Sequence, residues 1–181
     1  VGKIKNEIGI ESMAHLTCVG HKKDEIVSVL ESLENCGIEN ILALRGDPPK
    51  GEEQFIKTEG GFAYSNELVS FIKSNYSFCV GAACYPEGHI ECGNLSQDMD
   101  NLKRKVDCGV DFLITQLFFD NRYYFEFIKR AEKEGINIPI IPGIMPILNI
   151  KQSQRFTKMC GASLSESLIA KFNGVKEDLD K

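Results

Sequence analysis

The sequence predicts an α/β protein of the (β/α)8 TIM-barrel type, and three observations support this class. Five short apolar runs are nearly continuous, which is typical of parallel strands covered on both faces. Amphipathic helical patterns alternate with these runs, and polar residues gather where many of the runs end. A doubly wound sheet fits the same pattern. However, no G-x-G-x-x-G segment follows a run, which weakens a dinucleotide-binding sheet of that kind.

The predicted strands and helices follow one another in a regular order. The strands are MAHLTCV (13–19), NILALRG (40–46), FCVGAACY (78–85), DFLITQLFF (111–119) and IPIIPGIM (139–145). The helical patterns cover residues 22–37, 66–75, 96–109 and 121–135. Gly37, Gly109 and Gly135 are plausible helix stops. The apolar face of the first helix is made of Ile26, Val29, Leu30 and Leu33.

The length of the chain limits how much of a barrel it can form. A complete barrel needs about 250 residues, whereas this chain has 181 and shows five strands. The stretch 151–181 reads as helix or loop and supplies no closing strand. We therefore expect a single domain over residues 1–181 that is the central part of a barrel, with elements missing at both ends.

Composition excludes several classes of function. The net charge of -5, without clustered basic residues, argues against a nucleic-acid partner. No apolar run approaches the ~20 residues that span a bilayer, so no membrane segment is expected. The seven cysteines are odd in number and irregularly spaced, which favours a reducing cytosol and therefore a cytoplasmic protein. They lack C-x-x-C spacing, and no histidine lies at a metal-ligand offset, so no metal site is expected.

Charged and aromatic residues follow two of the predicted strands. Arg45, Gly46 and Asp47 end the second run, although an ordinary turn before Pro48 explains them better when they are taken alone. The third run ends in YPEGH (85–89), an aromatic, a rigid turn, an acid and an imidazole that suit a ligand pocket. Taken singly, a Pro-Gly loop with a solvated histidine explains this segment equally well.

Polar residues within helices and strands supply the other candidates. One stripe of the helix 96–109 carries Asp98, Asn101 and Lys105, with Arg104 beside it; a solvated helix face is the simpler explanation of this stripe. Gln116 and its neighbour Thr115 interrupt an apolar strand and must find a partner or a cavity. The strand period places His15 and Thr17 on one side. By default, His15 and Phe156 are expected in the core.

Taken together and in order, the motifs resemble the methylenetetrahydrofolate reductase family. They are AHLTC, ALRGD, AACYPEGH, the D-x-x-N-L-K-R-K helix, ITQLFFD and IIPGIMP, and they cover nearly the whole chain. The resemblance implies a (β/α)8 barrel with bound FAD that reduces 5,10-methylenetetrahydrofolate to 5-methyltetrahydrofolate in one-carbon metabolism and methionine biosynthesis. The implied reaction is ping-pong, with NADH, NADPH or a redox partner subunit as donor. A homo-oligomer is compatible with the sequence.

The resemblance also implies roles for individual residues. Asp47 would stabilise the cationic 5-iminium form of the folate, and Gln116 would contact the folate, so these two are the expected catalytic residues. Gln152 and Phe156 complete the implied substrate site, with Phe156 stacking on the pterin or the nicotinamide. The positions matching flavin contacts are His15, Arg45, Gly46, Asp47, Tyr85, His89, Asp98, Asn101, Arg104 and Lys105, and more weakly Ser65 and Cys92. Asp47 and Gln116 are expected to meet over the flavin ring.

The chain departs from the family pattern in what it lacks. The general-acid Glu of the family belongs to the first barrel strand, which precedes this chain, and the second-strand Thr and the last-strand elements are also missing. The isolated chain is therefore expected to fold poorly and to be inactive. Two alternatives stay open. One is a non-redox, folate-binding barrel of the methyltransferase kind, and the other is a catalytically silent barrel subunit that binds or scaffolds.

Overall fold

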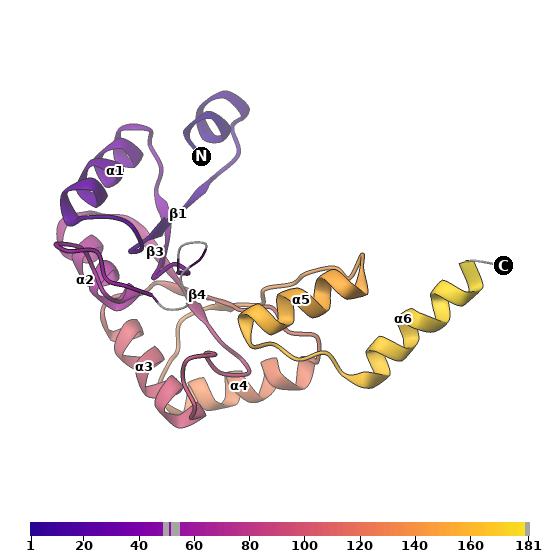
Figure 1. The fold of residues 1–181 in the computed structure, drawn as a ribbon. Helices are drawn as coiled ribbons and strands as arrows, with labels where there is room; N and C mark the ends of the chain where they lie inside the picture. Colours follow the sequence, from indigo (N-terminus) through magenta and orange to yellow (C-terminus); the bar gives the residue numbers. More distant parts are fainter. Residues whose placement is uncertain (49–50, 52–54, 180–181) are drawn as a thin grey trace. The chain divides into compact units, whose positions relative to one another are not determined.

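The computed structural model describes residues 1–48, 51 and 55–179. Helices follow the strands in the predicted order (Figure 1). The strands are β1 (Met13–Thr17), β2 (Asn40–Leu44), β3 (Cys79–Cys84), β4 (Phe112–Thr115) and β5 (Ile140–Ile141). The helices are the π-helix η1 (Ile4–Ile8), α1 (Lys23–Asn35), α2 (Ser65–Asn75), α3 (Leu95–Asp107), α4 (Asn121–Lys133), α5 (Ile150–Cys160) and α6 (Glu166–Leu179).

The strands form one sheet in the order β1-β2-β3-β4-β5. β1 pairs with β2 in parallel, from Met13 opposite Asn40 to Thr17 opposite Leu44. β2 pairs with β3 in parallel, beginning at Asn40 opposite Cys79. Strands that follow each other in sequence are therefore neighbours in the sheet, joined by helical crossovers. This order confirms the α/β class and is consistent with five successive units of a (β/α)8 barrel.

The described chain separates into two compact units that interleave along the sequence. Unit 1 contains Val1–Ala83 and Leu102–Leu113, and unit 2 contains Cys84–Asn101 and Ile114–Lys181. The boundary crosses β3, α3 and β4, so neither unit is a continuous stretch of chain. The single domain over residues 1–181 stays a prediction.

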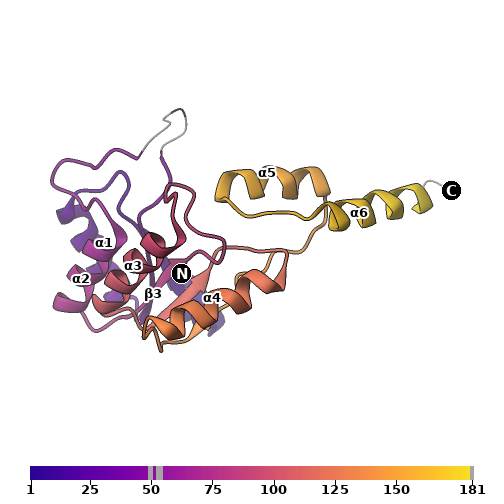
Figure 2. The same ribbon diagram turned by 90° about the horizontal axis from the view of Figure 1, so that it is seen from below.

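Unit 1 has a hydrophobic core between its strands and its helices. In both views α1 and α2 lie side by side on one side of the strands (Figure 1, Figure 2). Each fully buried Ile or Leu stabilises the fold by about 1.5–3 kcal/mol. Val29 was predicted on the apolar face of α1 but is 37% exposed, whereas Ile26 and Leu30 on the same face are fully buried. The buried side chains include Leu16, Ile41, Ala43, Val80, Leu68, Val69 and Ile72.

Buried and more exposed side chains alternate along β1. The burial of β1 alternates, with Ala14 and Leu16 buried and His15 exposed between them. This confirms the predicted alternation, which places His15 and Thr17 on the same side of the strand. The default expectation that His15 is a core residue is wrong, since its side chain points to the side of β1 away from the buried Ala14 and Leu16.

The last two strands are shorter than predicted. β4 ends at Thr115 instead of residue 119, and β5 has two residues instead of the run 139–145. Pro142 has no N–H for a ladder hydrogen bond, and the N–H of Gly143 donates to the Thr115 side-chain oxygen at 2.9 Å. Beyond Thr115, one backbone bond remains from the Gln116 N–H to the Cys84 carbonyl at 2.7 Å, and the Thr115 side chain takes the place of a backbone partner for Gly143. The apolar residues continue further than the regular strand pairing does.

The seven cysteines form no disulfide within the described residues, and Cys18 is fully buried. Burial raises the pKa of the Cys18 thiol from its ordinary value of 9.0 to about 12. We expect its thiolate fraction at pH 8 to be about a thousandfold lower than that of an ordinary thiol, so alkylation should require unfolding. Peptide mass spectrometry after native alkylation should find half-buried Cys108 modified and Cys18 unmodified. Rapid native labelling of Cys18 would contradict the burial.

The same shift predicts how alkaline pH affects stability. The unfolded thiol of Cys18 ionises near its ordinary pKa, about three units below the folded value of about 12. Ionisation therefore favours the unfolded chain, and the contribution of this group is lost as the pH rises from about 9 towards 12.

In the described part of the chain, no helix is long and apolar enough to cross a membrane.

Candidate functional site

The YPEGH segment forms a tight turn at the end of β3, within unit 2. The N–H of Gly88 donates to the carbonyl of Tyr85 at 3.0 Å, and Gly88 has a φ of 93°, which favours glycine. The rings of Tyr85 and His89 meet edge to face, with centroids 4.6 Å apart. The guanidinium of Arg130, on α4, donates to the carbonyl of Pro86 at 2.8 Å. The turn therefore presents an aromatic pair and is tied to α4.

A hydrogen-bond network orients His89. Its backbone N–H donates to the Asp98 carboxylate at 3.2 Å, and its ring Nδ1 accepts from the backbone N–H of Glu91 at 3.1 Å. Because Nδ1 accepts, the neutral ring carries its proton on Nε2. The N–H of Cys92 donates to the His89 carbonyl at 2.8 Å. The structure thus brings together four predicted flavin contacts, which are Tyr85, His89, Cys92 and Asp98.

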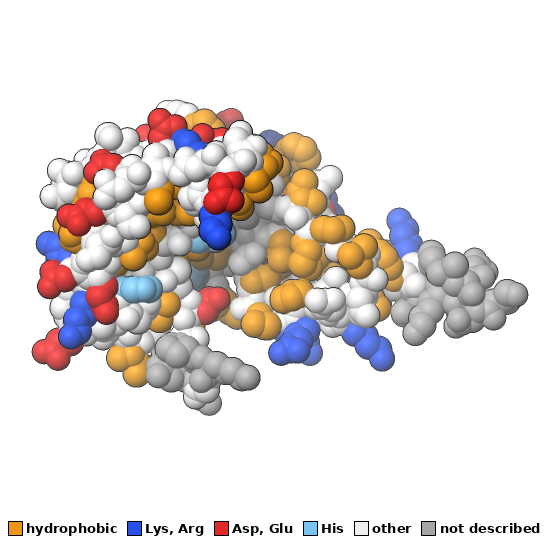
Figure 3. Space-filling view, turned by 90° about the horizontal axis from the view of Figure 1, so that it is seen from above, with side chains coloured by type: hydrophobic (Ala, Val, Ile, Leu, Met, Phe, Trp, Pro, Cys, Tyr) orange, Lys and Arg blue, Asp and Glu red, His pale blue; other side chains and the backbone are white. Residues whose placement is uncertain are grey.

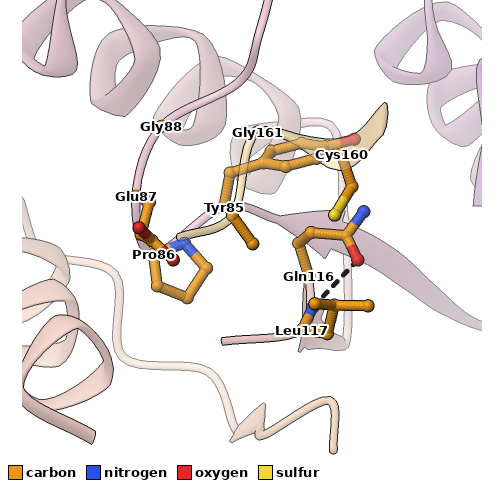
Figure 4. Close-up of a pocket in the computed structure, with 9 residues that line it drawn as sticks. Tyr85, Pro86, Glu87, Gly88, Gln116, Leu117, Cys160 and Gly161 are labelled. Atoms are coloured by element: carbon orange, nitrogen blue, oxygen red, sulfur yellow. Dashed lines mark hydrogen bonds between the residues drawn. The ribbon is translucent and has the colours of Figure 1, made fainter. Parts of the chain in front are cut away.

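A small pocket with a volume of about 10 Å³ opens beside this turn (Figure 4). Three segments of unit 2 surround it, the turn after β3, the end of β4 and the end of α5. Its volume is below the ~300 Å³ of sites that enclose a whole drug-sized ligand. It therefore has room for about one water molecule, or for one polar group at the edge of a larger ligand. The lining residues are Tyr85, Pro86, Glu87, Gly88, Gln116, Leu117, Cys160, Gly161 and Ala162.

Gln116 presents an oriented amide to this pocket. Its backbone N–H donates to the carbonyl of Cys84 at 2.7 Å, which continues the pairing of β3 with β4. Its side-chain oxygen accepts from the N–H of Leu117 at 2.8 Å, while the Cys160 sulfur points towards the amide (Figure 4). Since the oxygen has a protein partner, the NH2 end is the part that can donate to a ligand acceptor. The sequence predicts that Gln116 finds a hydrogen-bond partner or a cavity, and in the structure it has both.

One stripe of α5 carries the other predicted substrate contacts. Gln152, Phe156 and Cys160 are spaced by four residues, so they share a helix face. Gln152 is exposed, and Phe156 is 38% exposed, so the expectation that Phe156 belongs to the core is wrong. Hydrophobic side chains gather on the surface over α5 in Figure 3. Cys160 was missed as a site residue, although its spacing from Gln152 and Phe156 could have indicated it.

Unit 1 holds the second group of predicted residues, at the end of β2. The carbonyl of Arg45 accepts from the N–H of Val19 at 3.0 Å, and the Arg45 guanidinium lies 5.0 Å from the centre of the Phe55 ring. Gly46 has a φ of 88°, and an added Cβ would lie 2.4 Å from a Val19 methyl carbon. The backbone therefore requires glycine there for structural reasons alone. Asp47 follows and is exposed.

The remaining predicted flavin contacts belong partly to unit 1 and partly to unit 2. Lys105, in unit 1, donates from its ammonium to the carbonyl of Ala83 at 2.7 Å, so it supports β3 directly. Arg104 beside it is exposed. Ser65 is the first residue of α2. In unit 2, the side-chain oxygen of Asn101 accepts from Gln97 at 3.5 Å. Since Asp47 and Gln116 belong to different units, their expected approach stays a prediction.

The chemistry of each group fits a part of a flavin dinucleotide. In unit 1, the cations Arg45, Arg104 and Lys105 are donors of the kind that bind phosphates with charge-assisted hydrogen bonds. In unit 2, the Tyr85 ring and the protonated Nε2 of His89 suit a flat, polar ring system. Within the described residues, no group of three His, Cys, Asp or Glu side chains is placed to hold a metal ion.

Comparison with known sequences gives a consistent result. The profile of the family described as methylenetetrahydrofolate reductase matches residues 1–181. Methylenetetrahydrofolate reductase (NADH) 1 of Arabidopsis thaliana is 40% identical over 97% of this chain and 32% of that protein. The 5,10-methylenetetrahydrofolate reductase of Escherichia coli K12 is 38% identical over 98% of this chain and 58% of that protein. The chain thus spans a third to somewhat over half of these relatives.

Comparison with solved structures concerns the fold alone. A phosphonopyruvate hydrolase in complex with oxalate and Mg++ has a TM-score of 0.55 at 12% identity, covering 99% of this chain and 74% of that chain. A 2,3-dimethylmalate lyase of the PEP mutase/isocitrate lyase superfamily has a TM-score of 0.51 at 11% identity, covering 99% and 72%. At such low identity, the likeness supports the arrangement of strands and helices only.

Proposed function

Because the chain belongs to the methylenetetrahydrofolate reductase family, we propose that the full-length protein reduces 5,10-methylenetetrahydrofolate to 5-methyltetrahydrofolate. The observation that carries this proposal is the pocket at the end of β4, where the Gln116 amide faces the turn after β3 and the end of α5. An amide donor beside an aromatic turn suits the polar edge of a pterin. The proposed location is the cytoplasm, where free thiols persist.

FAD is the proposed cofactor, and it would supply the hydride that the protein itself cannot provide. Arg45, Arg104 and Lys105 would bind its phosphates, with Gly46 and Asp47 beside them. Tyr85 would give an aromatic surface, and His89, held by Asp98, would lie beside it at the flavin. The proposed contacts are completed by His15, Ser65, Cys92 and Asn101. NADH, NADPH or a redox partner subunit would reduce the flavin and leave before the folate binds, and assembly as a homo-oligomer is compatible with this scheme.

The folate would be bound and polarised by four residues of this chain. Gln116 and Gln152 would donate or accept at polar edges of the substrate, and Phe156 would stack on its ring with an exposed face. Asp47 would place a negative charge near the cationic 5-iminium group and so stabilise the form that accepts hydride. The proton for ring opening would come from the general-acid Glu that the family carries outside this stretch.

The test uses the purified full-length protein. It should be yellow, its visible absorbance should bleach with a reduced nicotinamide or another donor, and the colour should return on adding methylenetetrahydrofolate. Product analysis should then find 5-methyltetrahydrofolate. A colourless protein that still binds the folate would refute flavin-dependent reduction and favour a non-redox folate-binding barrel. A yellow protein whose flavin is not reoxidised by the folate would favour a silent subunit.

A further inference from the structure

Glu87 joins two walls of the pocket. One carboxylate oxygen accepts from the backbone N–H of Ser163 at 3.1 Å, and the other accepts from the Ser163 hydroxyl at 2.5 Å. Glu87 belongs to the turn after β3, whereas Ser163 lies just beyond Gly161, which ends α5 with a φ of 74°. Both carboxylate oxygens therefore hold the end of α5 beside the turn. Such charge-assisted bonds are stronger than neutral ones.

Few side chains of α5 are buried against the rest of the protein. Its buried residues are Ser153 and Thr157, both of which carry hydroxyl groups and bring little apolar area. Its larger side chains, Phe156 and Met159, are 38% and 65% exposed. The hydrophobic stabilisation of a helix grows with the apolar area that it buries. α5 therefore gains little stability in this way. The polar contact between Glu87 and Ser163 therefore adds to the small apolar contribution that holds its C-terminal end.

We propose that Glu87 is a positioning residue that latches the C-terminal end of α5 to the turn after β3, and so sets the pocket that receives the folate. The latch keeps Cys160 and Gly161 against the pocket, and through the same helix it places the stripe that carries Gln152 and Phe156. This inference rests on the proposed function for its effect on folate. The latch itself does not, because it is a contact within the protein.

The first measurement reports the latch without any substrate. In the full-length protein, Glu87→Ala should raise the alkylation rate of Cys160 by about tenfold, because a released α5 end exposes that thiol more often. Buried Cys18 in the same molecule should stay unmodified, which excludes global unfolding. Peptide mass spectrometry separates the two sites. The matched control is Glu132→Ala, at an exposed carboxylate on α4, and it should leave Cys160 labelling unchanged.

The second measurement reports positioning of the substrate. Glu87→Ala should raise the KM for methylenetetrahydrofolate by about tenfold, with the rate of flavin reduction changed less than about twofold. Ser163→Ala removes one of the two bonds from the α5 side and should shift KM in the same direction by less. Glu87→Gln keeps an oxygen that can accept one N–H bond, so it should restore part of both effects. A residue with a purely local structural role would not show this split.

Each outcome decides a different part of the inference. Unchanged Cys160 labelling in Glu87→Ala, with Cys18 still protected, would overturn the latch whether or not the protein reduces folate. Increased labelling with an unchanged KM would overturn the positioning role. Equal losses in both half-reactions would also overturn it, because they would place Glu87 at the flavin. If the unaltered protein did not reduce folate, the proposed function would fail, and the labelling result would still decide the latch.

Discussion

Replacing Asp47 with Asn in the full-length enzyme is expected to slow folate reduction by about 100- to 1,000-fold. Asn has almost the same shape, but it lacks the negative charge that would stabilise the 5-iminium cation. Flavin reduction by the donor involves no such cation, so its rate should fall by less than about tenfold. Asp47 is exposed at the end of β2, and exposed surface substitutions usually change stability by less than about 0.5 kcal/mol.

The two half-reactions should be measured separately by stopped-flow absorbance of the flavin. Asp100→Asn provides a matched control, because Asp100 is an exposed carboxylate on α3 outside the proposed site. That variant should keep both rates within about twofold of the unaltered enzyme. Equal losses in the two half-reactions of Asp47→Asn would refute the proposed charge stabilisation, and they would point to a role for Asp47 in flavin binding.

Replacing Gly143 with Ala is expected to lower the free energy of unfolding by about 1–3 kcal/mol. A Cβ at this position would lie 2.2 Å from the carbonyl oxygen of Thr115, a backbone atom that cannot rotate away. The required shift would also disturb the bond from the Gly143 N–H to the Thr115 side-chain oxygen, now 2.9 Å long. Thr115 is only 4% exposed, so water could not easily replace that partner.

Denaturant unfolding of the full-length protein should reveal this loss as a lower midpoint with an unchanged slope. Gly93→Ala is the matched control, since a Cβ added at Gly93 meets no atom within 4 Å. That variant should differ from the unaltered protein by less than about 0.5 kcal/mol. Equal stabilities of the two variants would contradict the close approach of Gly143 to β4.

Local sequence patterns predicted the succession of strands and helices well. The prediction of the apolar face of α1 is confirmed for Ile26 and Leu30, which are fully buried. A helix that covers a sheet buries its apolar face, and the spacing of apolar residues shows which face that is. Gly37, Gly109 and Gly135 have positive φ values, as expected for helix ends. The ends of β4 and β5 were predicted less well. Strand pairing there is limited by Pro142 and by the bond from Gly143 to Thr115. The pattern of apolar residues does not reveal that bond.

The candidate site was predictable only in part. The structure brings His89 of the turn 85–89 into contact with Asp98, because nine residues separate them and a short loop leads directly into α3. The contact of Glu87 with Ser163 spans 76 residues, and that of Arg130 with Pro86 spans 44. No local pattern could indicate either contact. Cys160 is the intermediate case, since helical spacing from Phe156 predicts its direction but not the pocket it reaches.

The sequence by itself determined the α/β class, the order of the elements and the residue types gathered at strand ends, because hydrophobic periodicity and turn chemistry act over a few neighbouring residues. Only the tertiary structure decided that His15 and Phe156 are exposed, that the Gln116 amide oxygen already has a partner, and that a carboxylate of the turn after β3 holds the end of α5. These properties depend on which distant segments meet. A local sequence pattern does not indicate which distant segments come into contact, since these contacts and their free energy arise only when the chain folds.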